Sequence, residues 1–328
     1  MDSLIFSINA IAPIVLTVVI GYILKKLGLM NESFSKMANK LVFRIFLPVM
    51  VFLNIYKIDD IQNIGLFSGV YIVIVILAVF FIMIPITMTF CRDERKRGVL
   101  LQGSFRSNCA LVGVPLALEL FGDQGVIMVT LLTSISIPLY NVLAVISLSI
   151  FKKDGSKPSV KKILLDIVKN PLIQSVVVGF IALGIRAILV NSGIDFRLTD
   201  VKPVYTVLGY LSALATPLAL LVLGAQFEFS AVAALKREII LGTAVKIFFV
   251  PLFAIGVAYL FFRDSFGGAH FAAFVALFAT PIAVSSVPMS QEMDGDVTLA
   301  GQLLVWTTLF SILSLFLSSF LLHMAGIF

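Results

Sequence analysis

The sequence is poor in charge, cysteine and histidine. Only 13% of its 328 residues are Asp, Glu, Lys or Arg, about half the share of an average soluble domain. The two cysteines, Cys91 and Cys109, lie at the end of one apolar run and inside another, so they indicate neither a disulfide framework nor a metal site. The two histidines, His270 and His323, are too far apart in sequence to indicate a metal pair. We therefore predict no metal and no cofactor.

Motifs of soluble enzymes are missing as well. The sequence has no phosphate-binding P-loop and no glycine spacing of a dinucleotide site. It has no nucleophile paired with a base, and no set of metal ligands, inside its apolar runs. These absences argue against an enzyme.

Apolar residues dominate what is present. They make up 60% of the chain, and the mean hydropathy is +1.09. A core of this length cannot bury so many apolar side chains, so lipid must solvate much of the surface. The net charge of +6 comes from short basic clusters between apolar runs, a pattern typical of cytoplasmic loops rather than of a nucleic-acid interface.

Ten apolar runs are long enough, at roughly 20 residues each, to cross a bilayer. They are expected at 4–25, 35–56, 66–90, 98–121, 125–151, 167–190, 204–224, 238–262, 269–292 and 298–323. The first, third, fifth and seventh loops carry most of the Lys and Arg, so the odd loops are predicted to be cytoplasmic and both termini extracytoplasmic. We expect an all-α, multi-pass protein of the cell membrane.

The basic stretch 151–162 separates five spans from five. This divides the chain into a first repeat (1–151), a cytoplasmic central loop (152–166) and a second repeat (167–328), which lies inverted because five is odd. Residues 108–123, NCALVGVPLALELFGD, align with residues 281–296, PIAVSSVPMSQEMDGD. Pro115 then meets Pro288, and Glu119 meets Glu292, in the fourth span of each half.

Those two prolines predict broken helices. Proline removes a backbone donor, and in hydrocarbon the freed polar groups must be satisfied by protein or water. In secondary transporters, paired broken helices meet near the midplane and form the substrate site, where helix amino termini favour an anion. The predicted binding residues are Arg106, Asn108, Gly113, Pro115, Thr280, Pro281, Ser285, Ser286 and Pro288.

Charged residues inside spans are functional candidates. Arg106, Arg44 and Lys246 are each expected roughly 12–15 Å from the cytoplasmic end and are candidates to line one cavity, with snorkelling as the alternative for Arg44 and Lys246. Arg106 is the strongest candidate, because guanidinium binds a carboxylate with two hydrogen bonds. Glu119 and Glu292 either carry a coupling proton, or cap the broken helices or pair with a base.

The motifs FRSNCALVGVPLALELFGD and ATPIAVSSVPMSQEMDGD resemble those of the auxin efflux carrier family, particularly its bacterial malate/malonate permease-like members. The resemblance covers essentially the whole chain. It implies a homodimer whose protomers have a scaffold domain and a mobile transport domain that moves like an elevator. It also implies a small carboxylate substrate, malate-, malonate- or auxin-like, that binds beside Asn108, Pro115 and Pro288.

Two alternatives stay open. A sodium-coupled anion symporter of the bile-acid type has a related inverted-repeat fold, and Thr280, Ser285, Ser286 and Gln291 are candidate sodium ligands. A membrane sensor is the other alternative, although the sequence has no soluble output domain. If the protein is a transporter, coupling of transport to protons and coupling to sodium are both open.

Overall fold

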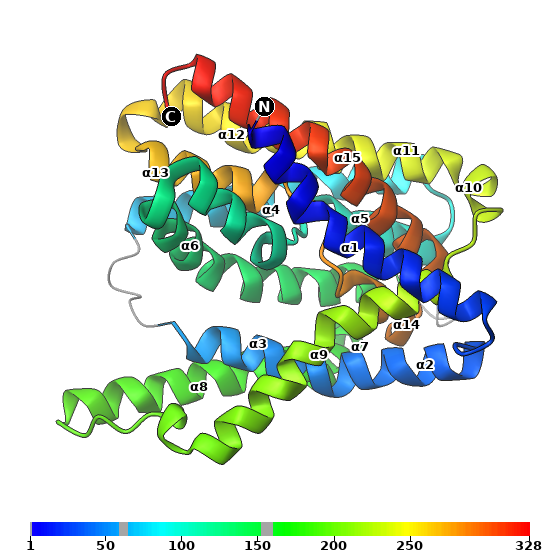
Figure 1. Cartoon of the computed structure of the whole chain (residues 1–328), viewed down its shortest axis with the longest axis horizontal. Helices are drawn as coiled ribbons and strands as arrows, with labels where there is room; N and C mark the ends of the chain where they lie inside the picture. Colours follow the sequence, from blue (N-terminus) through cyan, green and yellow to red (C-terminus); the bar gives the residue numbers. More distant parts are fainter. Residues whose placement is uncertain (1, 59–64, 152–159) are drawn as a thin grey trace.

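The computed structural model describes residues 2–58, 65–151 and 160–328, and this part of the chain is helical with no strand (Figure 1). Among the described residues, seven helices are long and apolar enough to cross a membrane: Glu32–Tyr56, Leu66–Phe90, Leu111–Ile150, Pro171–Asn191, Lys202–Gln226, Lys236–Ser265 and Val297–Met324. The multi-pass, all-α class is confirmed at this level. The arrangement of ten spans in two inverted repeats stays a prediction.

The α-helices have the following bounds: α1 Asp2–Lys26, α2 Glu32–Leu41, α3 Leu47–Tyr56, α4 Leu66–Phe90, α5 Glu94–Phe105, α6 Val114–Ile150, α7 Val160–Lys169, α8 Pro171–Asn191, α9 Lys202–Gln226, α10 Ala231–Ala234, α11 Lys236–Ala244, α12 Val250–Phe262, α13 Gly268–Phe274, α14 Ser286–Glu292 and α15 Val297–Met324. Part of the predicted central loop, 160–166, lies in α7, and 152–159 are outside the described residues.

Four π-helical turns occur in the part of the chain that the structure describes, and each is centred four residues before a proline. They are η1 Val42–Phe46 before Pro48, η3 Cys109–Gly113 before Pro115, η5 Val245–Phe249 before Pro251, and η7 Val275–Ala279 before Pro281. Proline lacks the N–H that would bond the carbonyl four residues earlier, and its ring collides with that carbonyl. Widening the helix to a π turn relieves this conflict.

The long α6 changes direction within its span. At 1.5 Å per residue its 37 residues would reach about 55 Å, well beyond a bilayer core of about 30 Å. The backbone leaves helical geometry at Phe121 and Gly122, and Gly122 has φ +58°, a conformation that favours glycine. This break falls between the predicted spans 98–121 and 125–151.

The helices pack in two groups. One contains α1, α2, α3, α8 and α9; the other contains α4, α5, α6 and α11 to α15, and α1 also packs against α15 of the second group. Within the first group α1 and α9 touch through their backbones, because a Cβ on Gly21 would lie 2.1 Å from the Leu221 carbonyl oxygen and one on Gly224 would lie 1.9 Å from that of Val18. Such close glycine contacts are typical of helix packing in membranes.

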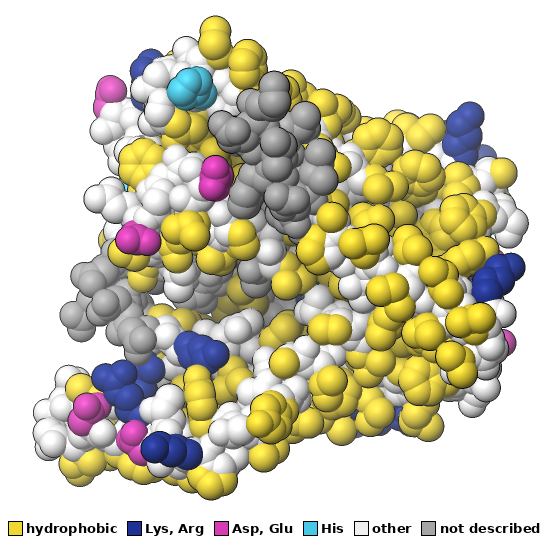
Figure 2. Space-filling view, in the orientation of Figure 1, with side chains coloured by type: hydrophobic (Ala, Val, Ile, Leu, Met, Phe, Trp, Pro, Cys, Tyr) yellow, Lys and Arg dark blue, Asp and Glu magenta, His cyan; other side chains and the backbone are white. Residues whose placement is uncertain are grey.

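The surface and the loops follow the membrane pattern. Figure 2 shows a broad hydrophobic face with the basic side chains toward its edges. In Figure 1 the connections after α1 and α9 lie at one end of the molecule, and those after α8 and α12 lie at the opposite end. The predicted odd and even loops among these four are therefore separated in space.

Candidate functional site

Two helix breaks meet in the interior. The first follows α5, which ends at Phe105, and covers Arg106 to Asn108, with Arg106 in extended geometry. The second lies between η7, which ends at Ala279, and α14, and covers 280–285. The backbone N–H of Asn108 donates to the carbonyl oxygen of Pro281 at 2.8 Å, so the unwound segments cross in direct contact.

The first break comes earlier than Pro115 predicts. Helical geometry resumes at Cys109 in η3, and Pro115 is the second residue of α6. The π turn accommodates the proline, so the chain does not need to unwind beside it. Pro288, by contrast, lies in the first turn of α14, where proline is tolerated best.

Glycine lets the two broken helices approach. A Cβ on Gly113 would lie 2.8 Å from the carbonyl oxygen and 2.9 Å from the Cβ of Ala276 in η7. The segments η3 and η7 therefore pack almost backbone to backbone behind the crossing. Gly113 is a packing residue of the crossing in this structure.

Arg106 is buried at the crossing, with 3% of its surface exposed. Its Nη2 donates to Asn141 Oδ1 at 2.7 Å and to Ser285 Oγ at 2.8 Å, and its Nη1 approaches Met289 Sδ at 3.0 Å. All three partners are neutral. A buried guanidinium with neutral partners retains strong attraction for an anion.

A cavity of about 190 Å³ lies against this arginine. Arg106, Ser107 and Asn108 line it from the first break, and Ala283, Val284 and Ser285 from the second. The Nδ2 of Asn108 is buried and has no hydrogen-bond partner in the described structure. A free amide donor beside a buried cation suits a carboxylate oxygen.

The other predicted binding residues do not line the cavity. Thr280 donates to the Ala276 carbonyl oxygen, Pro281 supplies the carbonyl bonded by Asn108, and Ser286 is buried with an unpartnered hydroxyl. Pro288 is buried within α14, and Pro115 is exposed. Of the nine predicted residues, the described cavity lining includes three, Arg106, Asn108 and Ser285.

Five polar residues of the lining were missed by sequence reasoning: Asn54, Ser107, Tyr140, Asn141 and Thr216. Asn54 and Asn141 left a usable signal, because each is a lone amide inside an apolar run. Ser107 stands between two predicted residues. Nothing in the sequence distinguishes Tyr140 or Thr216 from packing residues.

The three intramembrane cations do not share one cavity in the described structure. Arg106 lines it, whereas Arg44 forms an ion pair with Glu292 at 3.3 Å. Lys246 is fully buried in η5, its Nζ donates to the hydroxyl of Ser107, and it does not line the cavity. The predicted acids differ as well: Glu119 is exposed, while the Glu292 side chain is only 15% exposed.

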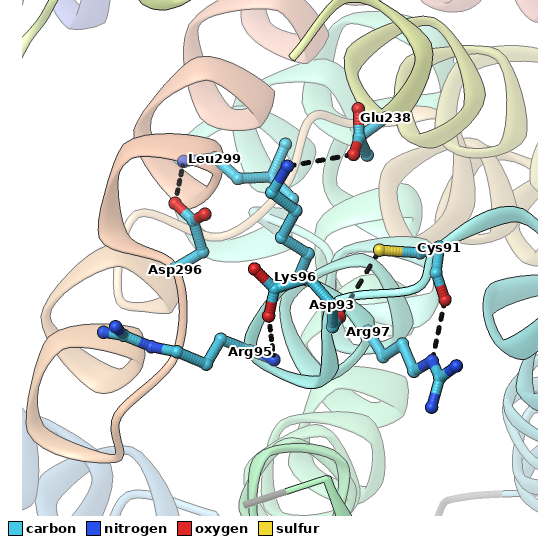
Figure 3. Close-up of polar contacts among 8 residues, drawn as sticks. All are labelled: Cys91, Asp93, Arg95, Lys96, Arg97, Glu238, Asp296 and Leu299. Atoms are coloured by element: carbon cyan, nitrogen blue, oxygen red, sulfur yellow. Dashed lines mark hydrogen bonds and ion pairs between the residues drawn. The ribbon is translucent and has the colours of Figure 1, made fainter. Parts of the chain in front are cut away.

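A polar cluster fixes the basic end of α5 (Figure 3). Lys96 forms an ion pair with Glu238 of α11 at 3.1 Å, and Arg95 donates to the carbonyl oxygen of Asp294. Burial disfavours the charge of Lys96, but the hydrogen bond and attraction to Glu238 outweigh it, so the pKa of Lys96 is raised. Asp296 caps α15 through the N–H of Leu299.

The sequence profile of the membrane transport protein family matches residues 6–318. The chain belongs to this family, the auxin efflux carrier family. An uncharacterized transporter of Methanothermobacter thermautotrophicus is 24% identical over 94% of this chain and 96% of its own length. Another, of Methanocaldococcus jannaschii, is 27% identical over 73% of this chain and 74% of its own. The protein is thus a membrane transporter, and the crossing lies inside the matched region.

Proposed function

We propose that this member of the auxin efflux carrier family is a secondary transporter of small organic anions, mono- or dicarboxylates of the malate, malonate or auxin type. The observation that carries the proposal is Arg106, a buried cation with neutral partners that lines a cavity between two helix breaks. The cavity of about 190 Å³ is smaller than the roughly 300–1,000 Å³ of drug-sized pockets, which favours an acid of few carbon atoms.

Alternating access is proposed to follow the elevator scheme. The group α1, α2, α3, α8 and α9 would be the scaffold, and the group that contains both breaks would be the moving transport domain. In this proposal the chain has ten spans in two inverted repeats and acts as a homodimer in the cell membrane. Relative motion of the groups would carry Arg106 and the bound acid across the barrier.

Sodium coupling of the bile-acid type is the second candidate. Gln102 Oε1 and Ser286 Oγ are buried next to the second break without hydrogen-bond partners in the described structure, and oxygen atoms of this kind are sodium ligands in principle. The small cavity does not favour a bile-acid-sized substrate.

Thermal-shift measurements on the purified protein test both candidates. The panel contains acetate, malonate, malate and indole-3-acetate, each with and without sodium and at two pH values. Ligand binding to the native state raises the melting temperature by mass action. We expect at least one acid to stabilise the wild type and not Arg106→Ala. No shift with any acid, together with no exchange of them in proteoliposomes, would refute the organic-anion proposal, and a sodium-dependent shift would favour the second candidate.

A further inference from the structure

Lys246 is buried and has no role in the anion site proposed at Arg106. We propose that Lys246 carries the coupling proton of this transporter: its amine takes up one proton when a carboxylate binds in the Arg106 cavity and releases it when the carboxylate leaves. The inference rests on the proposed function and adds the coupling ion to it.

Two contacts set the position of Lys246. The Lys96–Glu238 ion pair joins α5 and α11 near their starts, and the hydrogen bond from Lys246 to Ser107 joins the segments that directly follow them, η5 and the first break. Lys246 follows Glu238 by eight residues, about 12 Å along a helix. Its amine therefore lies deep in the protein, in contact with Ser107 of the first break.

No carboxylate of the described residues pairs with this charge. Lys246 is 0% exposed, and its hydrogen-bond partner, the Ser107 hydroxyl, is neutral. Within residues 2–58, 65–151 and 160–328, no carboxylate forms an ion pair with Lys246 or with Arg106. A buried ammonium is costly without a counter-charge.

The elements packed against η5 carry few ionisable groups near Lys246. These elements are α5, α11, α12, α15 and η7. Segment η7 has no ionisable residue. The ionisable residues of α5 and α11 lie in the first turn of each helix, and Arg106 directly follows α5. Helix α12 has Tyr259 and α15 has His323, both near the C-terminal end of the helix. The neighbouring η3 begins with the buried Cys109, and the cavity adds Tyr140.

Of the two buried cations only one can discharge. Guanidinium stays protonated in proteins, whereas a buried lysine readily gives up its proton. With the cavity empty, the neutral amine of Lys246 leaves Arg106 as the single charge at the crossing. A bound carboxylate neutralises Arg106 and attracts a second positive charge, which favours the ammonium form. Acid and proton then bind cooperatively, because linkage is reciprocal.

Ser107 supplies the route between cavity and amine. Its residue lines the cavity, and its hydroxyl oxygen accepts from Lys246. A hydroxyl both donates and accepts, so it can pass a proton from cavity water to Nζ and receive one back. The step forms one N–H bond on Nζ, breaks one O–H bond of water or hydronium, and leaves the acid unchanged.

The first measurement uses the detergent-solubilised wild type in weak buffer. The probe is malonate, or whichever acid of the panel binds more tightly, at about pH 7 to 8.5, where the acid itself is essentially fully ionised. We expect an uptake approaching one proton per acid bound. Binding of the acid without proton uptake would overturn the inference and leave the proposed function standing, whereas absence of any acid binding or exchange would remove both.

The second measurement uses proteoliposomes with radiolabelled acid. Lys246→Met cannot bind the proton and Lys246→Arg cannot release it, so both are expected to exchange acid for acid but to lose accumulation driven by an inward pH gradient. Lys202→Met, an exposed lysine of α9, is the matched control and should accumulate like the wild type. Accumulation by Lys246→Met equal to the wild type would overturn the inference. The inference would also be overturned if Cys109→Ala, Glu119→Gln or Glu292→Gln lost this accumulation while Lys246→Met retained it.

Discussion

The backbone N–H of Asn108 donates to the carbonyl oxygen of Pro281 at 2.8 Å. This bond joins two segments from opposite halves of the sequence, both unwound inside the protein. Unwound backbone is tolerated at membrane depth only where protein or water satisfies its polar groups. Here each break satisfies a group of the other, and the side chains of Arg106, Asn108 and Ser285 are left to face a common cavity.

Arg106 variants test the anion site. Arg106→Lys keeps the charge but loses the planar guanidinium, whose Nη2 donates to both Asn141 and Ser285. We therefore expect acid affinity to fall at least tenfold. Arg106→Ala should lose as much or more, about 1.5–3 kcal/mol for hydrogen bonds to a charged group. Isothermal titration with the acid measures both. Arg263→Lys, a change at an exposed arginine that does not line the cavity, is the control. Unchanged affinity in a folded Arg106→Ala protein would exclude Arg106 from the site.

Gly113 tests the close packing behind the crossing. An added methyl group would lie 2.8 Å from the Ala276 carbonyl oxygen, so Gly113→Ala should force η3 and η7 apart and cost about 1–3 kcal/mol. The melting temperature in detergent should fall accordingly. Gly184→Ala is the matched control, because no atom lies within 4 Å of the added Cβ. Equal melting temperatures of the two variants would contradict the packing role.

The Arg44–Glu292 ion pair tests the role of the repeat-related acids. Because 61% of the Arg44 side chain is exposed, solvent screening limits the coupling to about 0–1 kcal/mol. A double-mutant cycle of Arg44→Gln and Glu292→Gln, followed by thermal melting, should give a coupling in that range. Glu119→Gln and Glu292→Gln should both retain accumulation driven by a pH gradient; loss of accumulation with exchange intact would make that acid the proton carrier instead.

Cysteine labelling tests the orientation. Asp93 and Asp195 are exposed, and the native Cys91 and Cys109 are buried. Cysteines introduced at positions 93 and 156 should react with a membrane-impermeant maleimide only from the cytoplasmic side, and one at 195 only from outside. Position 156 lies outside the described residues. Reaction of 156 and 195 from the same side would end the model of five spans on either side of the central loop.

Local chemistry made much of the fold predictable. The apolar runs fixed where helices can form, because only helices satisfy every backbone group within a single segment in lipid. Proline predicted local distortion but not its form: π turns precede Pro48, Pro115, Pro251 and Pro281, whereas Pro13, Pro85, Pro138 and Pro217 lie inside α-helices. The polar residues near Pro115 and Pro288 also pointed to a crossing, and Arg106, Asn108 and Ser285 line its cavity.

Tertiary structure decided which side chains meet. Similar predicted depth in the membrane suggested that Arg44, Arg106 and Lys246 line one cavity. Depth alone does not say toward which side of its helix each side chain points. Packing turned Arg44 toward Glu292 and Lys246 toward Ser107, and it brought Tyr140 and Thr216 to the cavity. These contacts span up to 248 residues along the chain, and only the packing of whole helices brings residues so far apart in sequence within hydrogen-bonding distance.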